Sequence, residues 1–442
     1  MKFNRPVTIG LAAIVALGVG GSLAATQAVA QNAAPKAPKA QAGSLSLTKE
    51  FFGNAVEPYT GKQTAVFRYT LSNANGMSVQ ILTYGGIVQA INVPDKHGKN
   101  ADVVLGFPTL ADYVAEVSPP VIANGGPYFG ELIGRYGNRI AKGTFQLKQP
   151  DGQVHTYTLP LNNGVNALHG GLVGFGNHIW ADQPVKTSSE VGVQLTLVSP
   201  NGDESHPAGS PGCPNGCTGY PAELKTVVTY TLNNDNQIGI HYAATDESPN
   251  LNTVLNLTNH SYFNLAGEGS GSAANQVIRI NADHFTPTDS TLIPTGAEPS
   301  VAGTPFDFTH PRTIASAIED CTGGPNSLGC QQLLFAQGLD HNWVLNSTGP
   351  QMDGLNLAAT ALDRASGREL TVWTDQPGVQ FYTSNFLNGT LVGTSGHIYR
   401  QTQAYTFETQ HFPNSPNQPS FPSTELDAGK TFTSTTVFAF SS

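Results

Sequence analysis

The chain has 442 residues and a formal net charge of −10, and only 12% of its residues are charged. No cluster of Lys and Arg is present of the kind that holds phosphate backbones, which argues against nucleic acid as a partner. Gly (48 residues) and Pro (30 residues) are plentiful, as is typical of a β-rich protein with many turns.

The N-terminus has the features of an export signal. Lys2 and Arg5 precede a long apolar run, and Ala28–Ala30 form an A-x-A cleavage site, so residues 1–30 are predicted to be a secretory signal peptide. Residues 31–48 are rich in Ala, Pro and Lys and are predicted to be a flexible tether. No later apolar run is long enough to span a bilayer. We therefore expect a periplasmic or extracellular protein without a transmembrane segment after signal removal.

Residues 49–442 are predicted to form one large all-β domain, because short apolar or alternating runs follow one another with turn residues between them. Many strands and few helices favour an antiparallel sandwich or barrel. A single helical turn is expected at Thr109–Val114. In chain order, the predicted strands are Thr64–Ser72, Ser78–Tyr84, Ile87–Val93, Val103–Gly106, Thr144–Leu147, His155–Leu159, Val191–Val198, Leu224–Leu232, Gln237–Ala244, Asn252–Leu257, Gln276–Ala282, Glu369–Thr374, Val379–Thr383, Ala404–Glu408 and Thr431–Phe440.

Four cysteines, Cys213, Cys217, Cys321 and Cys330, lie in loops rich in Gly, Pro and Asn. An even number in an exported protein favours disulfides, and the local pairs Cys213–Cys217 and Cys321–Cys330 are expected. The alternative is a zinc site. The spacing of the first pair would suit zinc, but the second pair is nine residues apart and an oxidising compartment works against thiolates.

The stretch Asn256–Gly267 places His260 among small polar and aromatic residues, directly after a predicted strand. A histidine titrates near neutral pH and can give or take a proton at a site presented by a strand end. Taken alone, His260 is more simply a structural histidine bonded to the backbone. The other polar stretches of the chain change that balance.

Two glycine-rich stretches precede it. Tyr128–Ile140 carries Asn138 and Arg139, and an arginine presents a fork of donors to hydroxyl or carboxylate oxygens. Leu161–Gly171 places His169 before two glycines, which allow close approach of the backbone to a ligand. The simpler interpretations are a surface ion pair for the arginine and a turn histidine.

Three later stretches each carry one polar candidate. Asp340 lies in Gly338–Trp343, and its carboxylate could hold neighbouring sugar hydroxyls or cap a loop. Gln380 lies in a strand with aromatic neighbours, a composition seen in sugar sites and in ordinary strands. Glu408 stands among Phe and Thr residues, where partial desolvation would raise its pKa towards that of a useful base, although a lone Glu is more simply a solvated surface charge.

Motifs for other chemistries are absent from the sequence. It contains no H-E-x-x-H, no G-x-S-x-G and no GxxxxGK[ST] segment, and its twelve histidines are scattered singly. Metalloprotease, α/β-hydrolase and P-loop chemistry are therefore not expected, and neither a metal nor a cofactor is predicted.

Together these stretches resemble the aldose 1-epimerase (galactose mutarotase) family. The matching motifs occur in the family's order and cover nearly the whole mature chain. They are YGGIVQAINVPDKHGKNADVVLGF from Tyr84, YFGELIGRYGNRI from Tyr128, LNNGVNALHGG from Leu161, NLTNHSYFNLAG from Asn256, GLDHNW from Gly338, PGVQFYTSNFLNG from Pro377 and FETQHFPNSPNQPSFPS from Phe407.

The resemblance implies a large antiparallel β-sandwich, the supersandwich of this family, with an open sugar cleft. It implies interconversion of the α and β anomers of free aldohexoses such as glucose and galactose, an isomerase reaction of hexose metabolism that needs no cofactor. By motif, Glu408 matches the general base, His260 the general acid and His169 a second active-site histidine that bonds the sugar near its ring oxygen. The positions that match substrate-binding residues, or lie beside one, are Asn138, Arg139, Asp340 and Gln380.

The chain departs from the simplest family pattern by two insertions, around Asp203–Thr218 and Cys321–Cys330. Three rival functions remain. A glycoside hydrolase would need a second carboxylate beside Glu408, which only Asp340 offers. A non-catalytic sugar-binding protein would have no need of a matched acid and base. An epimerase of sugar phosphates would want several basic residues around its cleft.

Overall fold

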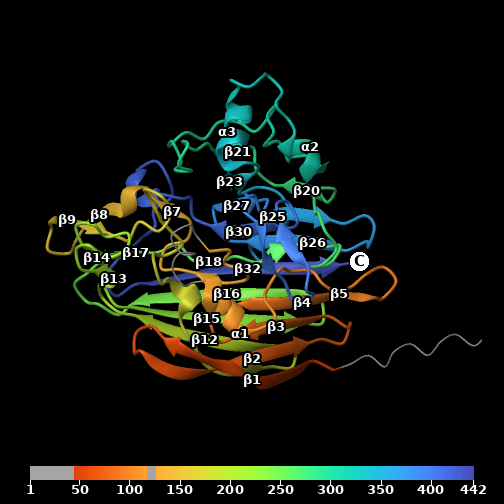
Figure 1. Ribbon diagram of the computed structural model, residues 1–442, viewed down its shortest axis with the longest axis horizontal. Coiled ribbons are helices and arrows are strands. Elements are labelled where there is room, and N and C mark those ends of the chain that lie inside the picture. The colour runs from red at the N-terminus through yellow and green to blue at the C-terminus, as the bar shows by residue number, and fades with distance from the viewer. Residues whose placement is uncertain (1–43, 117–125) are drawn as a thin grey trace, which may run out of the picture. The chain divides into compact units, whose positions relative to one another are not determined.

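Three antiparallel sheets form the framework of the computed structural model, which describes residues 44–116 and 126–442 (Figure 1). Every pair of named strands in these residues runs antiparallel, and strands far apart in the chain are neighbours in two of the three sheets. The first sheet has its five strands in sequential order: β1 (Ser46–Glu57), β2 (Lys62–Ser72), β3 (Ser78–Leu82), β4 (Val88–Pro94) and β5 (Asn100–Asp102).

The second sheet is the largest, with ten strands. Their order is β11 (Ala181–Lys186), β12 (Glu190–Ser199), β15 (Leu224–Asn233), β16 (Gln237–Asp246), β32 (Thr431–Ser441), β26 (Glu369–Thr374), β25 (Leu355–Leu362), β20 (Val277–Ile280) and β22 (Arg312–Thr313), with β24 (Gln351–Met352) paired to β25. The third sheet has five strands in the order β19 (Tyr262–Phe263), β30 (Tyr405–Gln410), β27 (Gly378–Tyr382), β23 (Asp340–Val344) and β21 (His284–Thr286).

Short strand pairs and helices complete the described residues. The pairs are β6 (Leu132–Ile133) with β18 (Thr258–Asn259), β7 (Arg139–Ile140) with β10 (Ala167–Leu168), β8 (Thr144–Lys148) with β9 (Val154–Thr158), β13 (Asp203–His206) with β14 (Cys217–Tyr220), β17 (Thr253–Val254) with β31 (Glu425–Leu426), and β28 (Asn388–Val392) with β29 (Ile398–Arg400). The helices are α1 (Leu110–Glu116), α2 (Ile314–Ile318) and α3 (Leu328–Ala336), and single 3₁₀ turns occur at Ala141–Gly143, Phe175–Asn177 and Ser415–Asn417.

The main core lies where the inner faces of the three sheets meet. Strand β15 shows the pattern behind it, because Leu224, Val228 and Tyr230 are buried whereas Lys225, on the opposite face, is exposed. Each such apolar side chain contributes roughly 1.5–3 kcal/mol on burial. One continuous cluster takes residues from all three sheets, among them Tyr69, Val79, Leu195, Tyr230, Phe381 and Phe407.

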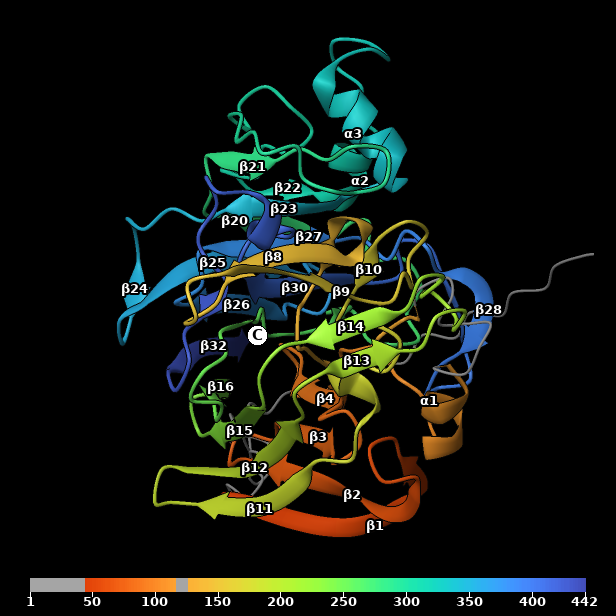
Figure 2. The ribbon, with the colours of Figure 1, turned by 90° about the vertical axis from the view of Figure 1, so that its left-hand side faces the viewer.

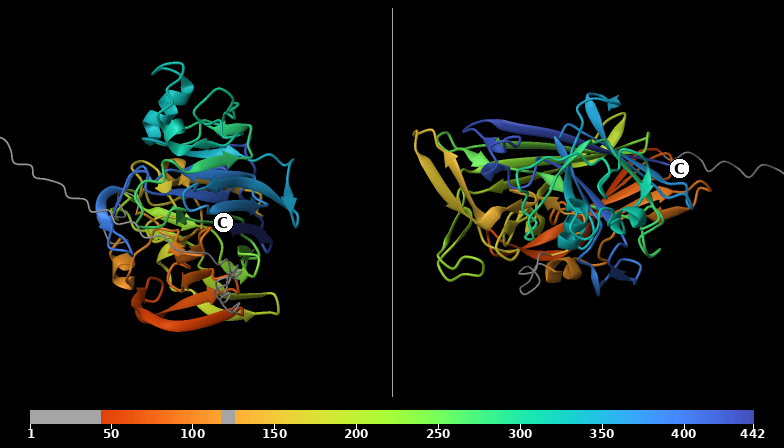
Figure 3. Two further views of the ribbon diagram at one scale, coloured as in Figure 1. Left: turned by 90° about the vertical axis from the view of Figure 1, so that its right-hand side faces the viewer. Right: turned by 90° about the horizontal axis from the view of Figure 1, so that it is seen from above.

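The views agree on how these elements are grouped. β12 and β15 lie beside β1 and β2 (Figures 1 and 2), and α2 and α3 lie beyond the third sheet, close to β21 and β22. The hairpins β8–β9 and β13–β14, gold to yellow-green, lie together on the side away from the C-terminus (Figure 3, right). The prediction of a large antiparallel β-sandwich is therefore confirmed.

Some local predictions need correction. Asn252–Leu257 contains only the two-residue strand β17, because the side-chain amide of Asn256 bonds the backbone of Gly137 and His411 and takes the place of a continuous ladder. Val103–Gly106 forms no strand and contributes only a bridge between Val104 and Phe263. The strands β1, β11, β23 and β25 and the helices α2 and α3 were not predicted, whereas α1 confirms the expected helical turn.

The predicted signal peptide, residues 1–30, lies outside the described residues. β1 begins at Ser46, so the last three residues of the predicted tether belong to the first sheet, where they pair with β2. None of the helices in the described residues combines the length and the apolar character needed to cross a bilayer. Cys213 is bonded to Cys217 and Cys321 to Cys330, as expected from their spacing.

Candidate active site

The third sheet presents a polar face, because polar and apolar residues alternate along β23, β27 and β30. Val379 and Phe381 of β27 enter the core, whereas Gln380 points to the opposite face. Phe407 and Glu408 divide in the same way on β30. All of these side chains are buried, so both faces of the sheet are covered and the polar face is largely shielded from water.

Strand register brings three predicted residues together on this polar face. Gln380 lies directly opposite Glu408, and Asp340 lies opposite Tyr382, two positions further along the same face. The Gln380 side chain donates a hydrogen bond of 2.7 Å to Asp340 Oδ1. Within the described residues, Gln380 Oε1 and Glu408 Oε2 have no hydrogen-bond partner, and Glu408 lines the cavity described below, where its free oxygen is available to a ligand.

His260 lies between the short strands β18 and β19, at the edge of the same sheet. Its backbone carbonyl accepts a hydrogen bond from Gly130 N at 3.0 Å, which ties it to the segment Tyr128–Ile140. His260 Nε2 lies 3.4 Å from Glu408 Oε1, and Thr406 donates to the same carboxylate oxygen at 2.9 Å. Both side chains are about 95% or more buried.

The pairing of β7 with β10 brings the remaining residues into place. Leu168 is the register partner of Arg139, so His169 follows beside Asn138. Asn138 N donates to His169 Nδ1 at 3.2 Å, and His169 N donates to Asn138 O at 3.1 Å. Arg139 Nη1 then lies 3.7 Å from Asp340 Oδ2, which joins this loop region to the third sheet.

A cavity of about 860 Å³ opens over these groups. Its lining includes six of the seven predicted residues, Asn138, Arg139, His169, His260, Asp340 and Glu408. Gln380 is not part of the lining and reaches the site through its bond to Asp340. Aromatic rings surround the two histidines, and Tyr128 packs edge-on against His169 with ring centroids 4.6 Å apart.

Burial sets the protonation of the pair. Desolvation, aided by the nearby Asp340 charge, raises the pKa of Glu408 to about 8, against the opposing effects of Thr406 and Arg139. Desolvation lowers the pKa of His260 to about 3. Both shifts favour the neutral forms, a carboxylic acid beside a neutral imidazole, over the ionic pair. The expectation that Glu408 is desolvated is confirmed.

The three groups at the centre of the site also resemble a set of metal ligands. One donor atom from each of His169, His260 and Glu408 lies within 4.8 Å of the others. His169 fits this role poorly, because its Nδ1 accepts the backbone N–H of Asn138, so the neutral ring carries its hydrogen on Nε2. The arrangement suits hydrogen bonding better than metal binding, and the absence of a required metal stays a prediction.

Sequence reasoning missed several residues that complete the site. Tyr128 packs against both histidines, with its ring centroid 5.8 Å from that of His260. Asn163 accepts a 3.0 Å hydrogen bond from Arg139 Nε and fixes the guanidinium. Thr406 orients Glu408 from the same strand face. The two-residue spacing of Thr406 and Glu408 was the one available signal, since Tyr128 and Asn163 act across segments far apart in the chain.

The two arginines of Tyr128–Ile140 have different environments. Arg139 lines the cavity, but Arg135 is only 1% exposed and donates to the backbone carbonyls of Pro221 and Ala222 at 2.8 and 2.9 Å. Its neighbour Ser199 accepts from Arg135 Nε and donates to Asp203. The surface ion pair considered as the simpler interpretation of this stretch is therefore wrong for both arginines.

Comparisons with known proteins give one consistent result. The family model described as aldose 1-epimerase matches residues 68–439. The chain is 38% identical to galactose mutarotase of Sus scrofa over 90% of this chain and 99% of that protein. It is 33% identical to aldose 1-epimerase of Escherichia coli strain K12 over 84% of this chain and 94% of that protein.

Solved structures agree with this assignment. A galactose 1-epimerase from Lactobacillus acidophilus superposes with a TM-score of 0.70 at 26% identity, covering 90% of this chain and 99% of that one. Because the family model spans most of the chain and the similarity extends through all the segments that form the cavity, the chain belongs to the aldose 1-epimerase family.

Proposed function

We propose that the protein interconverts the α and β anomers of free aldohexoses, such as glucose and galactose, by opening and closing the sugar ring. One observation carries the proposal, namely the buried pair in which His260 Nε2 lies 3.4 Å from Glu408 Oε1. Family membership supports it. The reaction as proposed moves two protons and needs no cofactor.

Ring opening is a balanced exchange between this pair and the hemiacetal. Glu408, as a carboxylate, takes the proton of the anomeric hydroxyl, and the C1–O1 bond becomes a carbonyl. The bond from C1 to the ring oxygen breaks, its electron pair stays on that oxygen, and protonated His260 supplies the proton. The aldehyde rotates about the C1–C2 bond, and the reverse steps close the ring on its other face.

The desolvated site favours the protonation state that the pair has while the sugar is in its open-chain form. After ring opening, the pair consists of a carboxylic acid and a neutral imidazole, the same form that burial favours in the resting site. The ionic form differs from it only by one proton transferred between the two side chains. The protein thus lowers the free energy of the state that accompanies the open-chain aldehyde, relative to that of the ionic pair.

The other residues are proposed to bind the sugar. His169 carries its hydrogen on Nε2 and can donate it to an oxygen near the ring oxygen, because its Nδ1 is occupied by Asn138 N–H. Arg139 and Asp340, linked across 3.7 Å, offer donors and acceptors to adjacent hydroxyls. Gln380 and Asn138 hold these groups in place.

The pH profile distinguishes this mechanism from one in which neutral His260, and not its protonated form, donates the proton. Between about pH 3 and pH 8 the pair keeps its transferable proton, and above the Glu408 pKa of about 8 the proton is lost to solvent. We expect kcat/KM, corrected for the uncatalysed rate, to be level between pH 5 and 7 and to fall about tenfold per pH unit well above pH 8. A rate that rises through pH 8 would show instead that neutral His260 is the acid.

Polarimetry of freshly dissolved α-D-glucose and α-D-galactose tests the function itself. The wild-type protein is expected to speed the drift of optical rotation to equilibrium for at least one of the two sugars, without releasing reducing sugar from glycosides. A drift equal to the buffer blank for both sugars would refute the proposal. Release of sugar from a glycoside would favour the hydrolase alternative, with Asp340 as second carboxylate.

We also propose that the chain is exported. The predicted signal sequence supports this, and both disulfides are of the kind that persists in an oxidising compartment. When the gene is expressed with its native leader, the N-terminal residue of the protein recovered outside the cytoplasm is expected to be Gln31. An intact Met1 on the active, disulfide-bonded protein would contradict this.

A further inference from the structure

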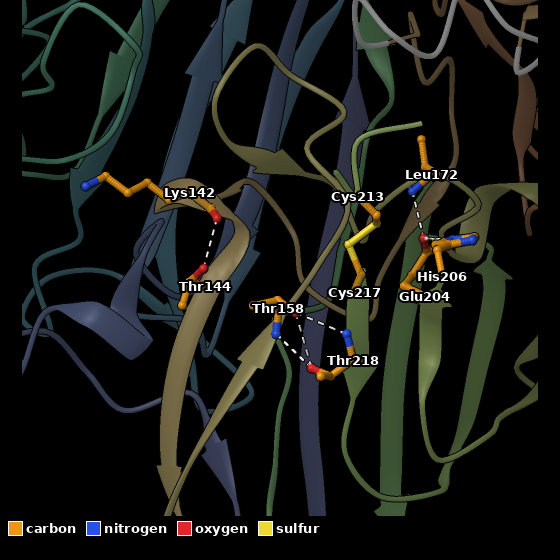
Figure 4. Close-up of a disulfide and its surroundings, with 9 residues drawn as sticks. All are labelled: Lys142, Thr144, Thr158, Leu172, Glu204, His206, Cys213, Cys217 and Thr218. Carbon is orange, nitrogen blue, oxygen red and sulfur yellow. Dashed lines mark hydrogen bonds and ion pairs between the residues drawn. A yellow bond between two sulfur atoms is a disulfide. The ribbon is translucent and has the colours of Figure 1, made fainter. Parts of the chain in front are cut away.

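The loop that follows His169 is held by a single carboxylate. The backbone N–H groups of Leu172, Val173 and Gly174 donate to Glu204 at 2.8, 2.8 and 2.9 Å (Figure 4 shows Leu172). Glu204 is only 6% exposed, and its own backbone takes a left-handed conformation, with φ of +64°. Three charge-assisted hydrogen bonds from consecutive residues fix both the path and the orientation of the loop.

The loop packs closely against its supports at two glycines. A Cβ on Gly171 would lie 2.5 Å from Glu204 Oε2, and one on Gly170 would lie 2.1 Å from Gly134 O. Both glycines have positive φ, of +133° and +100°. The residues directly after His169 are thus pressed between the Glu204 carboxylate and the backbone of Gly134.

Glu204 belongs to a hairpin with its own anchors, formed by β13 and β14 and containing the Cys213–Cys217 disulfide (Figure 4). Gly212 O accepts from Leu161 N at 2.9 Å. Thr158 and Thr218 exchange hydrogen bonds of 2.9 and 3.1 Å. The hairpin therefore holds the segment that leads into the His169 loop as well as the segment that leaves it.

We propose that Glu204 is a positioning residue. From the hairpin that the Cys213–Cys217 disulfide closes, it fixes the loop after His169 and so keeps the His169 side chain where it can bond the sugar. Glu204 does not line the cavity, so it acts through His169 and does not touch the sugar. The inference rests on the proposed function, because the effect on the rate presupposes that His169 bonds the sugar.

The test compares Glu204→Ala and Glu204→Gln with Asp102→Ala. Asp102 is a matched control, since its carboxylate also accepts backbone N–H groups, from Ile91 at 2.9 Å and Val104 at 3.2 Å, and neither partner lines the cleft. We expect kcat to fall about 10- to 100-fold in Glu204→Ala, since small misplacements of a reacting group have effects of this size. Glu204→Gln keeps one acceptor oxygen but turns an NH₂ donor towards at least one of the three backbone N–H groups, so an intermediate fall in kcat, about three- to tenfold, is expected. Asp102→Ala is expected to lose stability but keep its kcat within about twofold.

Two further readouts separate positioning from a general loss of stability. In a His169→Gln background, Glu204→Ala is expected to change kcat by less than about twofold, because both substitutions remove the same contribution. Hydrogen exchange of residues 172–174 is expected to speed up in Glu204→Ala and to stay unchanged in Asp102→Ala. If Glu204→Ala does not fold, Glu204→Gln is used in its place: its kcat is expected to fall and exchange at residues 172–174 to speed up, and wild-type values for both overturn the inference.

The outcomes distinguish this inference from the proposed function. A kcat within twofold of wild type in Glu204→Ala, or a loss that adds fully to that of His169→Gln, overturns the inference. A wild-type protein that does not accelerate mutarotation refutes the proposed function. In that case the exchange measurement still tests whether Glu204 holds the loop. Unchanged exchange at residues 172–174 in Glu204→Ala would show that it does not.

Discussion

Replacing Glu408 by glutamine is expected to lower kcat for hexose mutarotation by about 10²–10⁴-fold, the usual contribution of a positioned acid–base group. Glutamine preserves the shape of the side chain and an oxygen that accepts the Thr406 hydroxyl, but it cannot take a proton from the anomeric hydroxyl. His260→Gln is expected to lose a similar factor. The double variant should lose little more, because the two groups act as one proton-transfer unit. Polarimetry with subtraction of the blank measures all three.

Glu131→Gln provides the matched control for Glu408→Gln. Glu131 is a second buried carboxyl group whose pKa burial also raises to about 8, but it is not among the residues that line the cavity. The kcat of Glu131→Gln is expected to remain within about twofold of that of the wild type. If Glu408→Gln kept more than about a tenth of the activity while it remained folded, the assignment of Glu408 as the base would be wrong.

Arg135→Met is expected to cost about 3–5 kcal/mol in the free energy of unfolding, the range measured when one partner of a buried charged network is removed. The guanidinium of Arg135 donates to the carbonyls of Pro200, Pro221 and Ala222 at 2.8–2.9 Å, and methionine leaves these buried acceptors without a donor. Urea denaturation followed by tryptophan fluorescence gives the change from the shift of the midpoint.

Arg68→Met is the matched comparison for this effect. Arg68 pairs with Glu50 at 2.7 Å, but the Glu50 side chain is 53% exposed, so the pair is worth at most about 1 kcal/mol. If both arginine variants lost the same free energy of unfolding, the hydrogen bonds from Arg135 to the three buried carbonyls would not be the source of the larger effect.

The sequence predicts well the strands that bury one face and leave the other partly exposed. From Leu224 to Tyr230, buried positions of β15 alternate with exposed or half-buried ones, and its bounds differ from the prediction by only one residue at the C-terminal end. β1 was missed because it is a mostly exposed strand at the edge of its sheet and lacks alternation. β23 was missed for the opposite reason, since both of its faces are covered and its polar residues resemble a loop.

The candidate site was predictable only through the family motifs. Each residue taken alone had a simpler structural explanation, and none of the spacings predicts that Gln380 stands opposite Glu408 or that Asn138 caps His169. These contacts depend on strand register between segments far apart in the chain. The role of Glu204 has no local signal at all, because its three partners are backbone amides from another segment.

The position of β32 in the largest sheet affects how the protein can be made. β16 pairs with β15 on one side and with β32 on the other. Gln237, for example, pairs with Ala439, which is synthesised about 200 residues later. Until residues 431–441 have been synthesised, the edge of β16 is open to pairing with other chains. A nascent chain therefore cannot complete its largest sheet before residues 431–441 have emerged from the ribosome, and until then the unpaired edge of β16 is a place where aggregation can begin.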